Sequence, residues 1–228
     1  FSNAGLKKGF DDTRGTLFFD IARILEYHKP KAFLLENVKG LRGHDKGKTL
    51  QTIVRVLNNM DYNLSIEVLN AKYFGLPQNR ERIFIIGFKD VVDFQFPMPP
   101  MTPTRLGKIL HKNTSDKYTI SDRLWESHQN RKEKAKTKGY GFGYSLFNRD
   151  ATHTSTMSAR YYKDGSEILI EQKNKNPRML TPREAARLQG FPEDFVIPVS
   201  KGQAYKQFGN SVSINVIRAL AKEMEKYL

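Results

Sequence analysis

The sequence of 228 residues contains no cysteine, which excludes disulfide bonds, thiolate zinc sites and a cysteine nucleophile within this chain. It also lacks an apolar run of about 18 residues and a signal-peptide pattern, so no segment is predicted to cross a membrane and a cytoplasmic location is the default expectation. Acidic residues are few, since 24 Asp and Glu stand against 38 Lys and Arg, for a net charge of +14. This excess predicts a polyanionic partner, because basic side chains that neutralise phosphates release counterions.

The chain is nevertheless apolar enough for a packed core, with 39 % hydrophobic residues, and its length suits one large domain or two smaller ones. Residues 1–15 read FSNAGLKKGFDDTRG, a polar loop with no apolar period. This opening has no initiator Met. We therefore expect the amino-terminal part of the protein to lie in a removed segment or in a separate polypeptide.

An apolar run at residues 31–38 (KAFLLENV) stops on a carboxylate and an amide. Helical patterns flank it, which favours a central parallel strand covered on both faces. Open α/β sheets bind their ligands beyond the carboxyl ends of such strands. Glu36 is therefore a candidate acceptor or acid at a ligand site, with the Asn37 amide to hold it in place. A solvated glutamate at the end of a strand is the alternative interpretation.

Two amphipathic helices are predicted around this run, at residues 16–28 and 49–60. Pro30 ends the first helix before the strand begins. The apolar face of the first helix is predicted to comprise Leu17, Phe18, Ile21, Leu25 and His28.

Two further strands, residues 62–69 and 82–88, are predicted to pair in antiparallel fashion. Between them, the segment QNRER places Arg80 and Arg82 on the same side of an extended chain. Two guanidinium groups on one side can clamp a carboxylate or a phosphate. A solvated, charged entry to the strand is the alternative.

The composition changes after a proline-rich linker at residues 94–103. Residues 101–150 carry eleven Lys or Arg against five Asp or Glu, and they end in the glycine-aromatic segment GYGFGY. Such segments can approach a phosphate backbone and reach bases. For any single lysine of the run at residues 131–138, the solvated face of a helix is the alternative.

The final part of the chain has well-specified helix ends. A Thr cap, a Pro and a Glu open a helix at residues 181–184, and Gly190 closes it. Residues 203–213 (QAYKQFGNSVS) are predicted to form a polar loop. A last helix is expected to begin at Ile214.

Five segments together resemble the bacterial DNA (cytosine-5)-methyltransferases and cover most of the chain outside residues 95–150. They are ENV at residues 36–38, LPQNRERIFIIGF from Leu76, RMLTPREAARLQGFP from Arg178, QAYKQFGNSV from Gln203, and the opening FSNAGLKKGFDDTRGTLFFDIARI. The resemblance implies an α/β fold: the carboxyl-terminal half of a Rossmann-like S-adenosylmethionine-dependent methyltransferase domain plus a smaller, irregular, β-containing DNA-recognition domain. The implied divisions are a partial catalytic domain at 1–93, a target-recognition domain at 94–177, and a return segment with two helices at 178–228.

The resemblance also implies a reaction on duplex DNA and roles for single residues. The target cytosine is flipped out, a cysteine thiolate attacks C6, and C5 takes the methyl group of S-adenosylmethionine. Glu36, with the Asn37 amide beside it, matches the acid that reads cytosine N3 and N4. Arg80 and Arg82 match the arginines that hold O2 and the nucleophile. The predicted cofactor contacts are Leu17, Asn210 and Ser211, and the predicted DNA contacts are Ser2, Thr156, Arg160, Lys132 and Lys134.

The sequence departs from the family's pattern in two places, because it has neither a Pro-Cys-Gln nucleophile motif nor a glycine-rich cofactor motif. We therefore expect the chain to be inactive alone, as a truncated fragment, as part of a split enzyme whose amino-terminal polypeptide carries the nucleophile, or as an inactive paralogue. A non-catalytic DNA-binding or specificity subunit and an RNA cytosine methyltransferase are alternative functions. Glu36 favours the enzyme, because a protein that only binds a polyanion has no use for a buried carboxylate.

Overall fold

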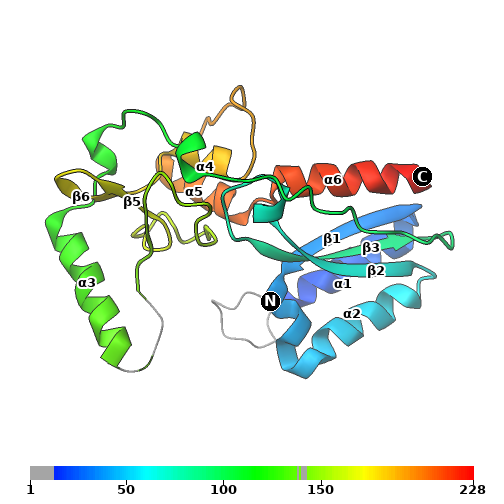
Figure 1. Cartoon of the computed structure of the whole chain (residues 1–228). Coiled ribbons are helices and arrows are strands. Elements are labelled where there is room, and N and C mark those ends of the chain that lie inside the picture. Colours follow the sequence, from blue (N-terminus) through cyan, green and yellow to red (C-terminus); the bar gives the residue numbers. More distant parts are fainter. Residues whose placement is uncertain (1–12, 138, 140–142) are drawn as a thin grey trace. The chain divides into compact units, whose positions relative to one another are not determined.

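The computed structural model describes residues 13–137, 139 and 143–228, which form two compact units (Figure 1). Within the described residues, the first unit comprises residues 13–70, 81–98 and 218–228, and the second comprises residues 71–80 and 99–217. Most of the predicted loop at residues 1–15 lies outside the described part. None of the described helices is long and apolar enough to cross a membrane.

The first unit contains a three-stranded antiparallel sheet of order β1-β3-β2. Its strands are β1 (Ala32–Val38), β2 (Asn63–Asn70) and β3 (Glu81–Phe88). The predicted antiparallel pairing of the second and third strands is confirmed. The parallel pairing predicted for β1 is not found among the described strands, because β1 pairs there with β3 alone and runs antiparallel to it. The more apolar β3 takes the centre, where six consecutive residues are buried.

Helices α1 (Thr13–His28) and α2 (Lys48–Asn58) cover one face of this sheet (Figure 1). The apolar stripe predicted for α1 is displaced by one residue. Phe18, Ala22 and Leu25 are buried against the sheet, whereas Leu17 and Ile21 are exposed. The core on this face comprises Phe18, Ala22, Leu25, Phe33, Leu41, Ile53, Leu57, Tyr62, Ile83 and Ile85.

The second unit is built around a small sheet and four helices. Strand β4 (Leu146–Phe147) is parallel to β5 (Leu169–Gln172), which is antiparallel to β6 (Lys175–Arg178). The helices are α3 (Asp122–Thr137), α4 (Pro182–Leu188), α5 (Lys201–Asn210) and the start of α6 (Ile214–Met224), which continues into the first unit. Short 3₁₀ segments lie at Lys39–Gly47, Ala71–Phe74, Leu106–Lys108, Asp116–Tyr118 and Glu225–Tyr227.

The start predicted for α4 is confirmed, and the loop predicted at residues 203–213 is corrected by α5. Thr181 and Glu184 form a reciprocal capping box at the start of α4. Most of the predicted loop at 203–213 is instead helical, with Tyr205 and Phe208 on the buried side of α5. The loop prediction failed because the polar and glycine-containing sequence has low helix propensity, which the burial of these two aromatic rings overrides.

Candidate functional site

Glu36 and Arg82 meet on neighbouring strands of the first unit. The register pairs Glu36 with Phe84 and Val38 with Arg82, so that Glu36 and Arg82 are diagonal neighbours on one face of the sheet. Their side chains form an ion pair, with 2.9 Å between Arg82 Nε and Glu36 Oε1. The exposed fractions are 16 % for the Arg82 side chain and 23 % for that of Glu36, so solvent screens this pair less than a surface pair.

Burial and the carboxylate act in opposite directions on the Arg82 guanidinium. Desolvation lowers the pKa of Arg82, and the charge and hydrogen bond of Glu36 oppose this by raising it. Arginine nevertheless stays protonated in proteins. The site therefore holds a fixed donor group beside a carboxylate. The carboxylate can accept from an amine of a small ring, and the guanidinium can donate to a carbonyl of the same ring.

Asn37 lies on the opposite face of β1, because successive side chains of a strand alternate. Its Oδ1 accepts a hydrogen bond of 2.8 Å from the backbone N–H of Val38. The Glu36 carboxylate therefore pairs with Arg82. The Asn37 amide instead accepts from the backbone N–H of the next residue, Val38.

Arg80 belongs to the second unit and is 2 % exposed. Its guanidinium donates to the carbonyls of Met157 at 2.9 Å, Gly209 at 3.0 Å and Ser211 at 2.7 Å. Arg80 and Arg82 therefore have different partners. The two-arginine clamp predicted from the sequence corresponds to two separate sets of contacts.

Two buried glutamines that the sequence interpretation did not single out complete this region. The Gln78 amide donates to Leu188 O at 3.2 Å and accepts from Met157 N at 2.9 Å. The Gln189 amide donates to Phe208 O at 3.0 Å. Both glutamines lie inside the segments that carry the family resemblance. Together with Arg80, they join four chain segments, at residues 77–80, 154–158, 188–190 and 208–213.

The predicted phosphate contact and the predicted cofactor loop both adjoin this network. The Thr156 hydroxyl donates to Asn79 O at 2.6 Å. Asn210 is exposed at the last position of α5. Ser211 follows it, and its N–H donates to Gln207 O at 2.8 Å. Thr156 and Ser211 of the second unit are therefore held by backbone carbonyls around them.

The other predicted DNA contacts occupy varied environments. The Lys132 ammonium lies 4.3 Å from the centre of the Tyr144 ring, a cation–π contact. Lys134 and Arg160 are exposed. Ser2 lies outside the described residues.

Helix α3, which carries the lysine run, has a single buried residue, His128. His128 Nε2 lies 3.0 Å from Asp164 O, which can only accept, so Nε2 carries the proton. His128 Nδ1 lies 2.5 Å from Arg131 Nη2, which can only donate. Arg131 also pairs with the Asp164 carboxylate at 3.1 Å. These contacts require the neutral imidazole.

Acidification is therefore expected to loosen α3. Burial lowers the pKa of His128 below its ordinary value of 6.5, Arg131 adds to this, and Asp164 opposes it. The unfolded chain then binds a proton before the folded chain does. The contribution of the neutral His128 imidazole to the free energy of unfolding is complete above about pH 6.5, and it is lost as pH falls through the folded-state pKa. It amounts to about 1.4 kcal/mol for each pH unit by which folding lowers the pKa of His128. Urea titrations on both sides of that pH, followed by the fluorescence of Trp125, the only tryptophan, will measure it.

The control for this prediction is His128→Gln, which keeps a donor for Asp164 O and does not titrate. Its urea midpoint should depend less on pH than that of the wild type. Equal pH dependence in both proteins would show that other groups cause it.

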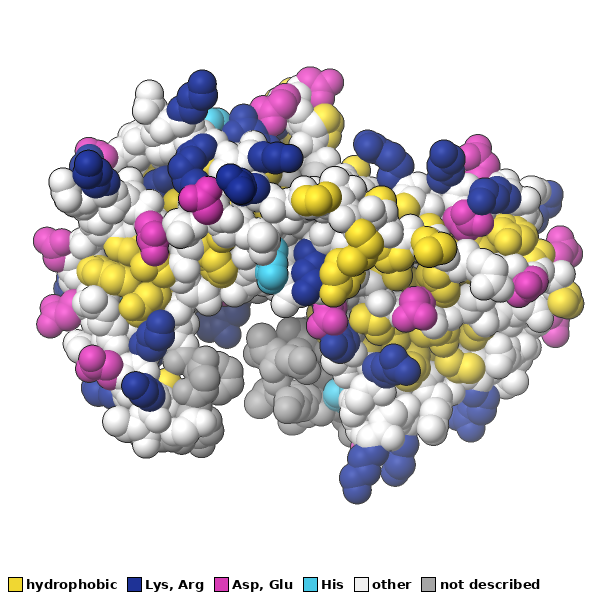
Figure 2. Space-filling view, in the orientation of Figure 1, with side chains coloured by type: hydrophobic (Ala, Val, Ile, Leu, Met, Phe, Trp, Pro, Cys, Tyr) yellow, Lys and Arg dark blue, Asp and Glu magenta, His cyan; other side chains and the backbone are white. Residues whose placement is uncertain are grey.

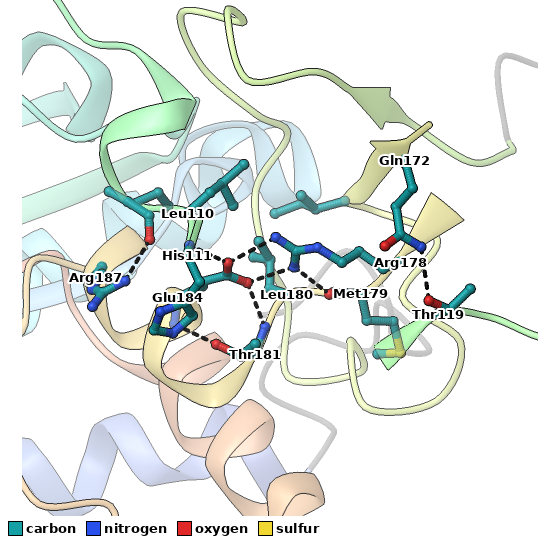
Figure 3. Close-up of polar contacts among 12 residues, drawn as sticks. Leu110, His111, Thr119, Gln172, Arg178, Met179, Leu180, Thr181, Glu184 and Arg187 are labelled. Atoms are coloured by element: carbon teal, nitrogen blue, oxygen red, sulfur yellow. Dashed lines mark hydrogen bonds and ion pairs between the residues drawn. The ribbon is translucent and has the colours of Figure 1, made fainter. Parts of the chain in front are cut away.

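A buried carboxylate organises the start of α4 (Figure 3). Glu184 accepts from Arg178 Nη1 at 2.8 Å and Nη2 at 2.9 Å, and from the backbone N–H groups of Thr181 and His111, each at 2.8 Å. Both charged side chains are buried. Four donors satisfy the carboxylate, and they come from the start of α4, the end of β6 and a loop some 70 residues earlier in the chain.

Comparisons with known proteins agree on one family. A family model described as C-5 cytosine-specific DNA methylase matches residues 1–226. Type II methyltransferase M1.ScrFI of Lactococcus lactis subsp. cremoris is 61 % identical over 233 residues, which cover 100 % of this chain and 60 % of that protein. M.NlaX of Neisseria lactamica is 62 % identical over 229 residues, which cover 100 % of this chain and 73 % of that protein. The chain thus spans well under the full length of either relative.

Solved structures show the same fold. The Entamoeba histolytica methyltransferase EhMeth matches with a TM-score of 0.77 at 20 % identity, covering 96 % of this chain and 70 % of that chain. The architecture is the α/β fold of methyltransferases, as the sequence predicted.

Proposed function

Because the chain belongs to the C-5 cytosine-specific DNA methylases, we propose that it takes part in methyl transfer from S-adenosylmethionine to C5 of a cytosine in duplex DNA. The names of its relatives, Type II methyltransferases, support a place in a restriction–modification system. The observation that carries the proposal is the Glu36–Arg82 pair, which sets a carboxylate beside a guanidinium at 2.9 Å.

This pair suits the cytosine ring at the stage where a nucleophile adds to C6. The base is flipped out of the duplex so that its edges are accessible. A thiolate that adds to C6 pushes negative charge toward N3 and O2. The Glu36 carboxyl group donates its proton to N3 and accepts from the N4 amine, and Arg82 donates to O2, so that both donors stabilise this charge. After C5 takes the methyl group, a base removes the C5 proton and the thiolate leaves.

S-Adenosylmethionine supplies the methyl group when it is bound. Leu17 on α1 and Asn210 at the end of α5 both have exposed side chains. They fit the cofactor in chemical type, because Leu17 offers an apolar contact for the adenosine part and Asn210 an amide for a polar part. Ser211 keeps this loop in place through its backbone contacts with Arg80 and Gln207.

The cysteine comes from another polypeptide segment in this proposal, since the chain has none. The first unit has surfaces that such a segment could cover. Ile21 and Ile24 form a second apolar stripe on α1, with exposed fractions of 37 % and 49 %. Strand β1 has a partner strand on one side only among the described strands. The segment is proposed to add a strand beside β1 and to pack on this stripe.

Residues 94–177 are proposed to read the DNA sequence. In the face shown in Figure 2, Lys and Arg side chains are scattered, with Asp and Glu between them. The distribution of charge on this face therefore does not by itself identify the surface that contacts DNA. Helix α3 offers a more specific surface, because Arg123, Asn130 and Lys134 line one shallow hollow along it, together with Glu126, Ser127 and Arg131. Arg and Asn are the side chains that most often read base edges, and Lys contacts phosphates.

The test is complementation. The purified chain should incorporate no labelled methyl groups into duplex DNA. Addition of the part of M.NlaX that this chain does not match should restore incorporation. Ile21→Glu, on the proposed docking stripe, should weaken the restoration, whereas Arg23→Glu on the same helix should not.

Two outcomes would count against the proposal. Methylation by the chain alone would exclude the thiolate mechanism. A completed complex that binds duplex DNA without methylating it would favour a non-catalytic DNA-binding protein, and transfer to RNA instead of DNA would favour an RNA methyltransferase.

A further inference from the structure

The contacts of Arg80 join two segments that are far apart in the chain. Met157, which accepts from Nη1, lies between Thr156 and Ser158. Gly209 and Ser211, which both accept from Nη2, lie on either side of Asn210. One guanidinium therefore holds the segment of residues 156–158, with its proposed phosphate contact, and the segment of residues 209–211, with its proposed cofactor contact.

The same two segments also touch directly. A Cβ atom at Gly209 would overlap the carbonyl group of Ser158 and the N–H of Ala159, so only glycine permits this approach. The segment of residues 156–158 is held from its other side by Gln78, which accepts from Met157 N. Neither segment can shift without disturbing the hydrogen bonds of Arg80.

We propose that Arg80 is a positioning residue that couples these two segments, so that DNA binding at Thr156 and ordering of the loop at Asn210 support one another. The proposal rests on the proposed function for the identity of the two ligands. It differs from the role expected from the sequence, because the guanidinium donates to three backbone carbonyls of the protein. Coupling of this kind is reciprocal, so each ligand strengthens the binding of the other.

Amide hydrogen exchange on the full chain tests the coupling without any ligand. The amides of Met157 and Ser211 report on the two segments, and that of Ala185 in α4 reports on the rest of the unit. Arg80→Lys should accelerate exchange at Met157 and Ser211 by about tenfold or more, because one ammonium cannot replace two donor nitrogens directed at two segments. Exchange at Ala185 should stay at the wild-type rate.

Arg149 provides a matched control. It also donates to three backbone carbonyls of this unit, those of Gly107, Leu110 and His111. Arg149→Lys should leave Met157 and Ser211 unchanged. Acceleration at only one of the two reporters in Arg80→Lys would overturn the coupling. Equal acceleration at Ala185 would reduce Arg80 to a general stabilising residue.

The wild-type chain gives an independent test, should Arg80→Lys fail to fold. If the two segments open as one unit, Met157 and Ser211 will exchange with the same opening free energy and the same dependence on urea. Different urea dependences would refute the proposal.

A duplex oligonucleotide extends the test to the ligand. In the wild type, the duplex should slow exchange at Met157 and Ser211 together, and in Arg80→Lys at Met157 alone. A duplex that slows Met157 but leaves Ser211 unchanged in the wild type would overturn the coupling. Failure of the chain to bind any duplex would instead count against the proposed function, and the ligand-free measurements would still decide the role of Arg80.

Discussion

Glu36→Gln is expected to slow methyl transfer by about 10²- to 10⁴-fold in the complemented enzyme, the usual contribution of a positioned acid or base. Glutamine keeps the size of the side chain but removes the charge that pairs with Arg82 and the group that can share a proton with N3. Duplex affinity should change little, because contacts between basic side chains and phosphates dominate it. Single-turnover rates and salt-titrated affinities on one duplex will separate the two effects.

Glu67→Gln is the matched control for this variant. Glu67 lies on β2 and faces the same residue of β3, Phe84, from the other side. The turnover of the Glu67→Gln enzyme should equal that of the wild type. Wild-type turnover in Glu36→Gln would mean that the strand carboxylate is only a solvated charge, and the mechanism would have to be abandoned.

Glu184→Gln is expected to destabilise the second unit by about 3–5 kcal/mol, the usual cost of removing one partner from a buried ion pair. The substitution leaves the Arg178 guanidinium buried without its counter-charge, and it turns an amide donor toward groups that themselves donate. Since whole domains are stable by only about 5–15 kcal/mol, the loss is a large part of the total. Urea unfolding followed by Trp125 fluorescence will measure it.

Glu193→Gln distinguishes this effect from the loss of any carboxylate near α4. Glu193 is exposed and pairs with Arg187 at 2.6 Å. Exposed pairs contribute little, so the unfolding midpoint should stay close to that of the wild type. Equal midpoints in the two variants would contradict a structural role for the Glu184 network.

Local sequence signals predicted the elements that depend on local physics. The capping residues Thr181 and Glu184 located the start of α4, apolar alternation located β2, and a strongly apolar run located β3. Position within the sheet was not predictable for β1, because its apolar run suits any buried strand and only the greater burial of β3 decides which strand is central. Helix α5 was missed because its helical state depends on the burial of Tyr205 and Phe208 against distant residues.

The candidate site was predictable to a similar degree. The side-chain types at positions 36 and 82 indicated an acid and a cation, and the register brings them together. The different surroundings of Arg80 could not be predicted, because its partners are backbone carbonyls, which every residue carries. For the same reason Gln78 and Gln189 gave no signal of their own, although the Gln78 amide bonds Leu188, 110 residues away, and the Gln189 amide bonds Phe208.

The open side of β1 also bears on how this chain behaves in solution. Among the described strands, the seven-residue β1 has a partner on one side only, and an edge of this kind can act as a template for the strand of a second copy of the same chain. We therefore expect the purified chain to aggregate as its concentration rises. The segment proposed to add a strand beside β1 would cover this edge, so producing the two together is expected to raise the yield of folded protein.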